Sequence, residues 1–165
     1  MKRYILALFF IITSTIAQTE ISTEIYNLIK QLDSTVPITE QSFAKNKLIS
    51  MGKDALPYLH KELQENKKTY IRIQIAWILG HIKDPSSIKV LEEVATGPYF
   101  NLNKACVMTL AEIGEESLIS LERLKSKTTE TNLLKIINNA EIKIKSTKTN
   151  TLSLSNSSTK KNKRK

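Results

Sequence analysis

The chain has 165 residues, enough for one domain of ordinary size, and 41% of them are apolar while only 6% are aromatic. Its core must therefore be built from aliphatic side chains. The single cysteine, Cys106, excludes an intramolecular disulfide, and four glycines with four prolines suit a helical protein with short turns.

The formal net charge of +9 points to nucleic acid only until the charges are located. Residues 1–17 carry two basic residues and no acidic one, and residues 145–165 carry seven basic residues and no acidic one. The stretch between them, residues 18–144, carries 16 of each sign. A nucleic-acid groove should be basic along one face, so the neutral central body argues against nucleic acid as the partner.

The first residues, MKRYILALFFIITSTIA, have the three parts of a secretory signal peptide. Lys2-Arg3 is the positive start, an apolar run follows, and Thr15-Ile16-Ala17 is a small-x-small cleavage site. The apolar run is shorter than the roughly 20 residues that a spanning helix needs. The pattern predicts a signal peptide over residues 1–17 and an exported protein, periplasmic or secreted. An uncleaved anchor and a buried helix are the alternatives.

From residue 18 onward, apolar residues recur with helical spacing. The spacing predicts helices over residues 22–32, 39–51, 54–65, 70–82, 86–95, 102–113, 115–124 and 128–144. Gly52 and Gly114 follow two of these helices directly, where glycine is the preferred residue for ending a helix. The low glycine content elsewhere agrees with an all-α fold.

Three of these helices repeat one another, because each apolar position i of one recurs at i+31 in the next. We call this spacing the repeat period. Within each helix the apolar positions have offsets i, i+4 and i+7, which lie on one face. The three columns are Ala44, Ile75 and Cys106; Leu48, Leu79 and Leu110; and Met51, Ile82 and Ile113. A fixed period of this length indicates a repeat architecture, in which stacking buries faces that one helix pair alone leaves open.

Two passages of the repeat resemble a known family. Residues 44–63 read A-x-x-x-L-x-x-M-G-x-x-A-L-P-x-L-x-x-x-L, and residues 71–91 read I-R-x-x-I-A-x-x-L-G-x-I-x-D-P-x-x-I-x-x-L. They resemble HEAT repeats, in the variety also found in phycobilisome-lyase-like proteins; the chain departs from the pattern at Lys83, where a glycine is usual. The resemblance implies an all-α fold over residues 18–145, a short HEAT-like α-solenoid of antiparallel helix pairs. Together with the leader, it indicates an exported bacterial protein.

Catalytic and metal-binding patterns are not found in the sequence. His60 and His81 lie in separate repeats, and Cys106 lies in an apolar column, where it is expected to be a small buried hydrophobe. A zinc site needs three or four ligands at defined spacing, which these residues do not supply. No nucleophile elbow, phosphate loop or dinucleotide fingerprint is present either. We therefore expect no enzyme, no metal and no cofactor.

The resemblance implies that the second helix of each pair lines the concave face, and that this face contacts a protein or peptide partner. The residues it would present there are Tyr58, Lys61, Glu62, Lys89, Glu92, Glu93, Ser120 and Arg123. Their mixed charge disfavours a nucleic-acid groove, and a solvated face without a partner is the alternative. Trp77 lies two residues from Ile75, off the inward face. It either packs against an adjacent repeat or anchors an interface.

The end of the chain, STKTNTLSLSNSSTKKNKRK, is predicted to form a disordered basic tail over residues 146–165, because it buries too little apolar surface to offset ordering entropy. Its basic cluster is Lys160, Lys161, Lys163, Arg164 and Lys165. Such a cluster binds anionic lipid or polysaccharide, or serves only as a solubilising end. The sequence thus predicts a non-catalytic protein–protein interaction module in the cell envelope. The alternative is an envelope-associated module that binds through its tail.

Overall fold

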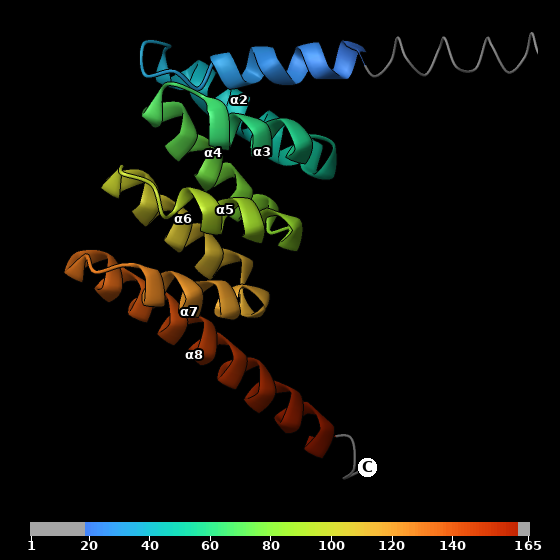
Figure 1. Cartoon of the computed structure of the whole chain (residues 1–165). Coiled ribbons are helices and arrows are strands. Elements are labelled where there is room, and N and C mark those ends of the chain that lie inside the picture. Colours follow the sequence, from blue (N-terminus) through green and yellow to red (C-terminus); the bar gives the residue numbers. More distant parts are fainter. Residues whose placement is uncertain (1–18, 162–165) are drawn as a thin grey trace, which may run out of the picture.

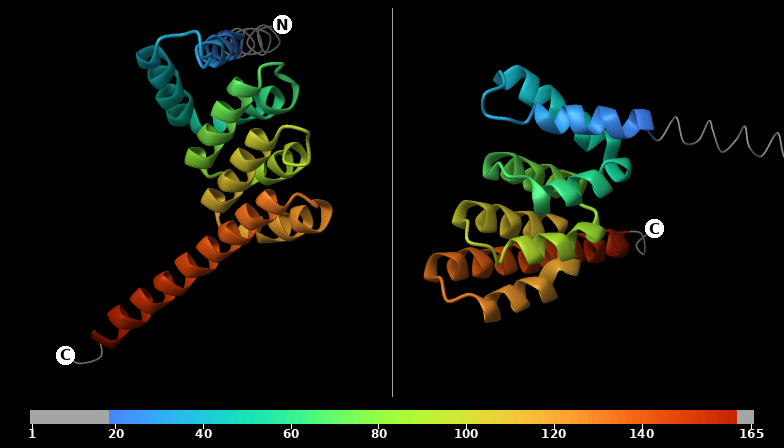
Figure 2. Two further views of the ribbon diagram at one scale, coloured as in Figure 1. Left: turned by 90° about the vertical axis from the view of Figure 1, so that its left-hand side faces the viewer. Right: turned by 45° about the horizontal axis from the view of Figure 1, so that its top comes forward.

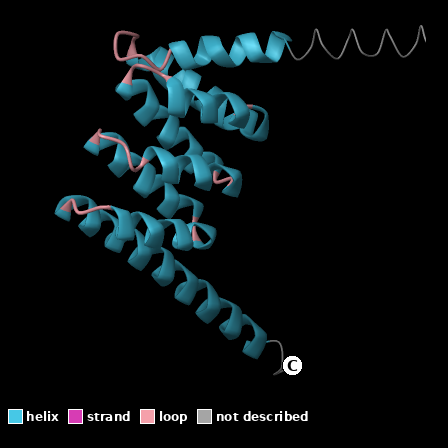
Figure 3. Cartoon of the chain, viewed as in Figure 1, coloured by secondary structure: helices cyan, strands magenta, loops and turns pink. Residues whose placement is uncertain are grey.

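The computed structural model describes the backbone of residues 19–161 and the side chains of residues 19–149. The predicted signal peptide over residues 1–17 lies outside the described residues. All regular elements in the described range are helices (Figure 3). The α-helices are an N-terminal helix over residues 19–30, α2 (Ile38–Met51), α3 (Leu56–Glu65), α4 (Thr69–Ile82), α5 (Ile88–Val94), α6 (Phe100–Ile113), α7 (Leu118–Lys127) and α8 (Thr131–Lys161). Short 3-10 helices over Gly52–Asp54, Pro85–Ser87 and Glu115–Ser117 precede α3, α5 and α7.

The helices stack in two layers, as Figures 1 and 2 show. We call α2, α4, α6 and α8 the first-helix layer, in which α4 packs between α2 and α6 and α6 packs against α8. We call α3, α5 and α7 the second-helix layer, in which α5 packs between α3 and α7. Each second helix also packs closely against the first helix of the following pair. The predicted α-solenoid of antiparallel helix pairs is confirmed.

The columns of the repeat describe the core. Members of the first two columns, such as Ile75, Cys106 and Leu79, have no exposed surface, and the third column lies partly buried at the edge of the core. Burying a leucine or isoleucine fully stabilises a fold by about 1.5–3 kcal/mol. The aliphatic columns therefore hold the stack together, as the composition required.

Three helix ends have a residue with positive φ at the same spacing, although only Lys83 is in the left-handed αL region. Gly52 follows α2 with φ 56°, Lys83 follows α4 with φ 55°, and Gly114 follows α6 with φ 105°. Positive φ costs a residue with a Cβ but not glycine. Lys83, the position where the sequence departs from the repeat pattern, has ψ 33° and so lies in the αL region, whereas Gly52 and Gly114 have ψ of -121° and -143°.

The last helix extends past its predicted end at residue 144, while the disordered tail over residues 146–165 stays a prediction. The last helix, α8, continues from Thr131 through Lys161 instead of ending at residue 144. No glycine or proline interrupts this stretch. The hydroxyls of Ser146, Thr147 and Thr149 donate to the carbonyls of Lys143 and Lys145, three or four residues back. These bonds satisfy polar side chains that composition alone assigns to disorder.

Candidate partner-binding surfaces

The predicted second-helix face includes an ion pair between neighbouring repeats. Glu92 on α5 is buried, and Arg123 on α7 donates to it from Nη2 to Oε2 at 2.8 Å and from Nε to Oε1 at 3.0 Å. Lys127 approaches the same carboxylate at 3.5 Å, and Arg123 also contacts Ser120 Oγ. Burial is the largest single influence and would raise the pKa of Glu92, but the hydrogen bonds from Arg123, Ser120 and Lys127 and the charge of Arg123 together lower that pKa. The ion pair therefore links two neighbouring repeats.

Most other predicted residues of this face also contact neighbours within the chain. The ring of Tyr58 meets that of Tyr26 edge-on, with centroids 5.5 Å apart. Glu62 accepts from Asn66 at 2.6 Å, and Glu93 accepts from Gln64 on α3 at 3.0 Å. The two remaining members, Lys61 and Lys89, make no ion pair with a described residue. That this face contacts a partner stays a prediction, with those two lysines as its free charges.

Only two of the five residues of the predicted basic cluster lie within the described backbone. Lys160 and Lys161 lie in the last turn of α8, and their side chains are not described. Lys163, Arg164 and Lys165 lie outside the described residues. Among the described residues no helix is both long and apolar enough to cross a bilayer.

His60 and Ser87 form the one described arrangement that resembles reaction chemistry. His60 Nε2 lies 2.9 Å from Ser87 Oγ, a distance at which a histidine can activate a nucleophile. Ser87, however, has no exposed surface, so a substrate cannot reach its hydroxyl. Burial lowers the pKa of His60 and favours the neutral ring. The contact therefore joins α3 to the turn before α5 and is structural.

Neither thiol nor metal chemistry is supported within the described part of the chain. Cys106 is fully buried, as predicted, and burial raises the pKa of its thiol to about 12. A thiol that is hardly ever ionised is a poor nucleophile. Among residues whose side chains are described, no three His, Cys, Asp or Glu residues gather as they would around a metal ion.

A polar column at the start of the first helices anchors the loops that precede them. Gln41 donates to Val36, Arg72 to Leu63 and Asn103 to Gly97, each from its side chain to a loop or helix-end carbonyl. The three polar residues follow one another at the repeat period, so they occupy one position of the repeat. Their common contact indicates a structural role.

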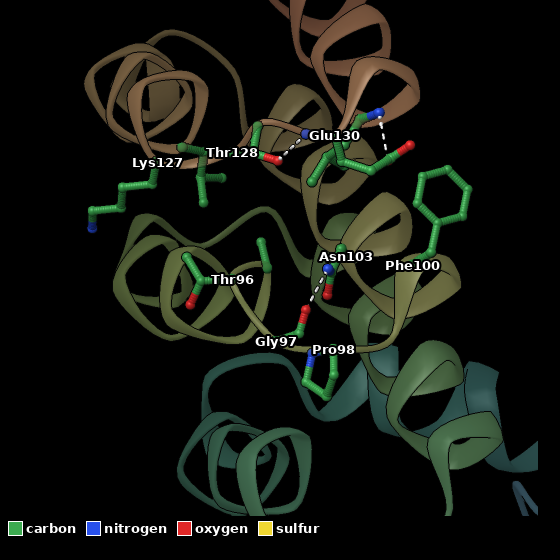
Figure 4. Close-up of a pocket in the computed structure, with 11 residues that line it drawn as sticks. Thr96, Gly97, Pro98, Phe100, Asn103, Lys127, Thr128 and Glu130 are labelled. Atoms are coloured by element: carbon green, nitrogen blue, oxygen red, sulfur yellow. Dashed lines mark hydrogen bonds between the residues drawn. The ribbon is translucent and has the colours of Figure 1, made fainter.

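A hollow of about 240 Å³ opens beside Asn103, between the loop before α6 and the turn before α8 (Figure 4). Asn103 Nδ2 donates to the Gly97 carbonyl at 2.7 Å, whereas Oδ1 is buried without a partner among the described residues. The hollow has room for a water molecule that would satisfy this oxygen. Because Asn103 repeats the loop contact of Gln41 and Arg72, we assign it to the architecture.

A larger hollow of about 400 Å³ lies on the first-helix layer, between α4 and α6. We call it the α4–α6 hollow. Its lining residues are Ile73, Trp77, His81, Lys83, Ala105, Met108, Thr109 and Glu112. Trp77 is 46% exposed and Met108 is 55% exposed, although both are large and apolar. Trp77 stacks on His81 with centroids 3.8 Å apart, and Lys45 Nζ lies 5.6 Å from its ring.

A further hollow of about 280 Å³ lies on the other side of α6 from the α4–α6 hollow. We call it the α6–α8 hollow. Its lining residues are Lys104, Met108, Ala111, Glu112, Ile136, Asn139, Ala140 and Lys143. Met108 and Glu112 line both hollows. Glu112 pairs with Lys143, and Lys83 Nζ lies 3.8 Å from Glu112 Oε2. The hydrogen bond from Lys143 is the main cause that lowers the pKa of Glu112.

None of the site residues predicted from the sequence lines the α4–α6 or α6–α8 hollow. Only Trp77, which the sequence left as either a packing residue or an interface anchor, lies there. The signal that could have found these hollows is the period itself. Trp77 and Met108 are one repeat period apart, and each lies two positions after a core residue, Ile75 or Cys106. That offset turns both away from the core and onto one surface. Trp77 is thus an exposed residue with ring contacts and not a member of the core.

Comparison with known proteins agrees with this geometry. Residues 56–133 match the family model for HEAT repeats. That segment begins at α3 and ends at the start of α8, so it includes both hollows except the part formed by α8 residues after Leu133. Comparison of the chain with curated proteins gave no match. HEAT repeats are commonly protein-interaction scaffolds, and the described fold is a HEAT-like solenoid.

Proposed function

We propose that this HEAT-repeat chain is a non-catalytic scaffold that binds another protein or peptide in the cell envelope or outside the cell. The observation that carries the proposal is the exposure of Trp77 and Met108 beside an open hollow on the first-helix layer. Exposed apolar patches that border a hollow are typical of interaction sites, and Trp is among the residues most enriched in binding hot spots. The leader over residues 1–17 supports the location.

Crosslinking in the native compartment, followed by reconstitution, tests the proposal. We expect one protein to be enriched from the envelope fraction or medium, and the purified pair to form a saturable complex. A variant that unfolds the stack, Leu79→Asp in the fully buried column, is the control and should not bind. Failure to reconstitute any saturable complex would contradict the scaffold function.

The N-terminus of the mature protein tests the location separately. Mass spectrometry of protein from the envelope or medium should find a chain that begins at Gln18, after the Thr15-Ile16-Ala17 site. An intact N-terminus in the cytoplasmic fraction would contradict export. It would leave the scaffold function standing, because binding does not depend on the compartment.

The alternative function is attachment to the envelope through the basic end of the chain, with the helical stack as a spacer. The seven basic residues and the absence of acidic ones after residue 144 support it. Vesicles of phosphatidylglycerol should then sediment the full chain but not a chain that lacks residues 146–165. Binding that survives this deletion, or vesicles of phosphatidylcholine that bind equally well, would contradict it.

A further inference from the structure

The apolar part of the first-helix face is divided between two hollows that repeat each other. Trp77 and Met108 flank the α4–α6 hollow, and Met108 and Asn139 occupy the equivalent positions beside the α6–α8 hollow, each one repeat period further along the chain. Packed helices lie about 8–10 Å apart. An elongated partner that crosses α6 would therefore meet two equivalent hollows about one helix spacing apart.

That spacing favours a helical partner over an extended one. Residues seven apart on an α-helix lie on nearly the same side and about 10.5 Å apart along its axis. Residues on one side of an extended strand repeat at about 6.6 Å and 13 Å, and neither value matches. Apolar anchors two helical turns apart can thus enter both hollows at once.

The charges around the two hollows are predominantly basic. Four lysines line the hollows or contact Trp77, and the only acidic side chain among those residues is Glu112. The lysines are Lys45, Lys83, Lys104 and Lys143. Lys83 and Lys143 share Glu112, while Lys104 has no ion-pair partner among the described residues. Three of these four positive charges are therefore left uncompensated, which complements an acidic partner.

We propose that the two hollows beside α6 bind an acidic amphipathic helix of a partner protein, whose apolar anchors are two turns apart and enter beside Trp77 and Met108. The proposal rests on the scaffold function and specifies its site and partner chemistry.

Other occupants fit these observations less well. The basic end of this chain would meet lysines of the same charge. Nucleic acid would place phosphates near Glu112, and its bases would have to displace His81 or Lys45 from the Trp77 ring. A second copy of the chain would have to present an acidic helix with apolar anchors, and the described first-helix layer presents lysines.

Trp77 is the only tryptophan of the chain, so its emission reports directly on this site. A phage-displayed library of random peptides of about 16 residues, long enough for four helical turns, is selected on the purified chain. We expect enriched peptides that are net acidic, with apolar residues at i and i+7. Synthetic copies should shift the Trp77 emission to shorter wavelength as they bind.

Two substitutions at exposed positions separate this site from general stickiness. Met108→Ser and Lys104→Glu should each weaken peptide binding by about tenfold or more, because they remove an anchor contact and invert a charge. Matched controls away from the two hollows are Ile119→Ser, at an exposed apolar residue of α7, and Lys67→Glu, at an exposed lysine between α3 and α4. Both controls should leave peptide affinity within about twofold.

Several outcomes would overturn the proposal. They are a library without enrichment, enriched peptides that are basic or lack the i and i+7 pattern, and binding that leaves Trp77 emission unchanged. Single-stranded oligonucleotides or phosphatidylglycerol vesicles that shift the emission where peptides do not would also overturn it. If the reconstituted partner binds the Met108 and Lys104 variants as tightly as the parent chain, this site is excluded while the scaffold function stands.

Discussion

Arg123 forms an ion pair with Glu92 of the preceding repeat. The two residues are one repeat period apart and occupy the same position of consecutive repeats. Arg123 Nη2 lies 2.8 Å from Glu92 Oε2, and its Nε lies 3.0 Å from Oε1. The carboxylate side chain is only 11% exposed, whereas that of Arg123 is 55% exposed. The buried partner is thus the one that depends on the contact.

Replacing Arg123 with alanine should lower the free energy of unfolding by about 1–2 kcal/mol, because it leaves a buried carboxylate with only Lys127 and the Ser120 hydroxyl beside it. Urea denaturation followed by circular dichroism measures this. Lys89→Ala, on the same face without an ion pair, is the control and should stay within about 0.5 kcal/mol of the parent chain. An unchanged midpoint in the Arg123 variant would show that the ion pair contributes nothing to stability.

Because Arg123 also stabilises the fold, Lys61 and Lys89 are better probes of partner binding at the second-helix face than Arg123.

Lys83→Gly should raise the free energy of unfolding by roughly 0.5–1 kcal/mol, because its φ of 55° is a conformation that costs a residue with a Cβ about 1–2 kcal/mol. The substitution also removes the 3.8 Å contact with Glu112, an exposed pair worth about 0–0.5 kcal/mol. Lys89→Gly, inside α5, is the control and should destabilise by about 1 kcal/mol. A destabilised Lys83→Gly variant would contradict the positive φ.

The sequence predicts those features of the fold that recur at the repeat period. The columns through Ile75 and Leu79 predict the buried faces, since a helix with apolar residues at i, i+4 and i+7 has only one way to bury them. The burial of Cys106 follows on the same basis. The repeat pattern also marks Lys83 as a departure, and the structure shows that this lysine ends α4 with a positive φ in the αL region.

The repeat pattern does not predict the contacts between neighbouring helices. Nothing in the spacing says that Glu92 is buried, because helix α5 is only seven residues long and carries lysine and glutamate among its apolar residues. The hollow beside Trp77 depends on how far apart α4 and α6 lie, which their separate patterns do not fix. Composition predicts disorder after residue 145 because this segment has few apolar residues, whereas the backbone of residues 146–161 continues α8.

Lys68→Met should raise the pKa of Asp33, which is about 2 in the native protein. The hydrogen bond from Lys68 is the largest cause of the lowered pKa, followed by those from the backbone N–H and hydroxyl of Thr35. Because the Thr35 bonds remain, the pKa should rise but stay below the ordinary value of 3.8. Carboxyl carbon chemical shifts in an NMR titration measure it, with Lys67→Met as the control.

The same carboxylate makes stability depend on acid pH. A group whose pKa is lower in the folded state stabilises the fold above its unfolded pKa, and this stabilisation is lost as pH falls through the folded value. The contribution of Asp33 should therefore disappear between about pH 4 and pH 2, and the loss should be smaller in the Lys68→Met variant. Equal acid sensitivity of the two chains would show that the Lys68 contact is not formed in solution.

Thr147→Pro should uncouple the end of α8 from the stack without weakening the stack. Proline at this position removes an N–H, clashes with the carbonyl of Lys143 and deletes the hydroxyl bond to that carbonyl. Among the described side chains of α8, Ile144 is the last that is buried, and residues 145–149 are exposed. The free energy of unfolding should therefore change by less than about 0.5 kcal/mol. Amide protection of residues 145–149 in hydrogen exchange should fall, and the ion pair between Lys148 and Glu115 should be lost.

Thr147→Ala keeps the backbone N–H and is the matched control, so it should retain the protection that the proline variant loses. Equal protection in the two variants would show that α8 does not continue past Ile144. A loss of several kcal/mol in Thr147→Pro would show instead that the extension belongs to the cooperative unit. Only the expected result, lost protection with unchanged stability, leaves the extension free to present the basic end of the chain independently of the core.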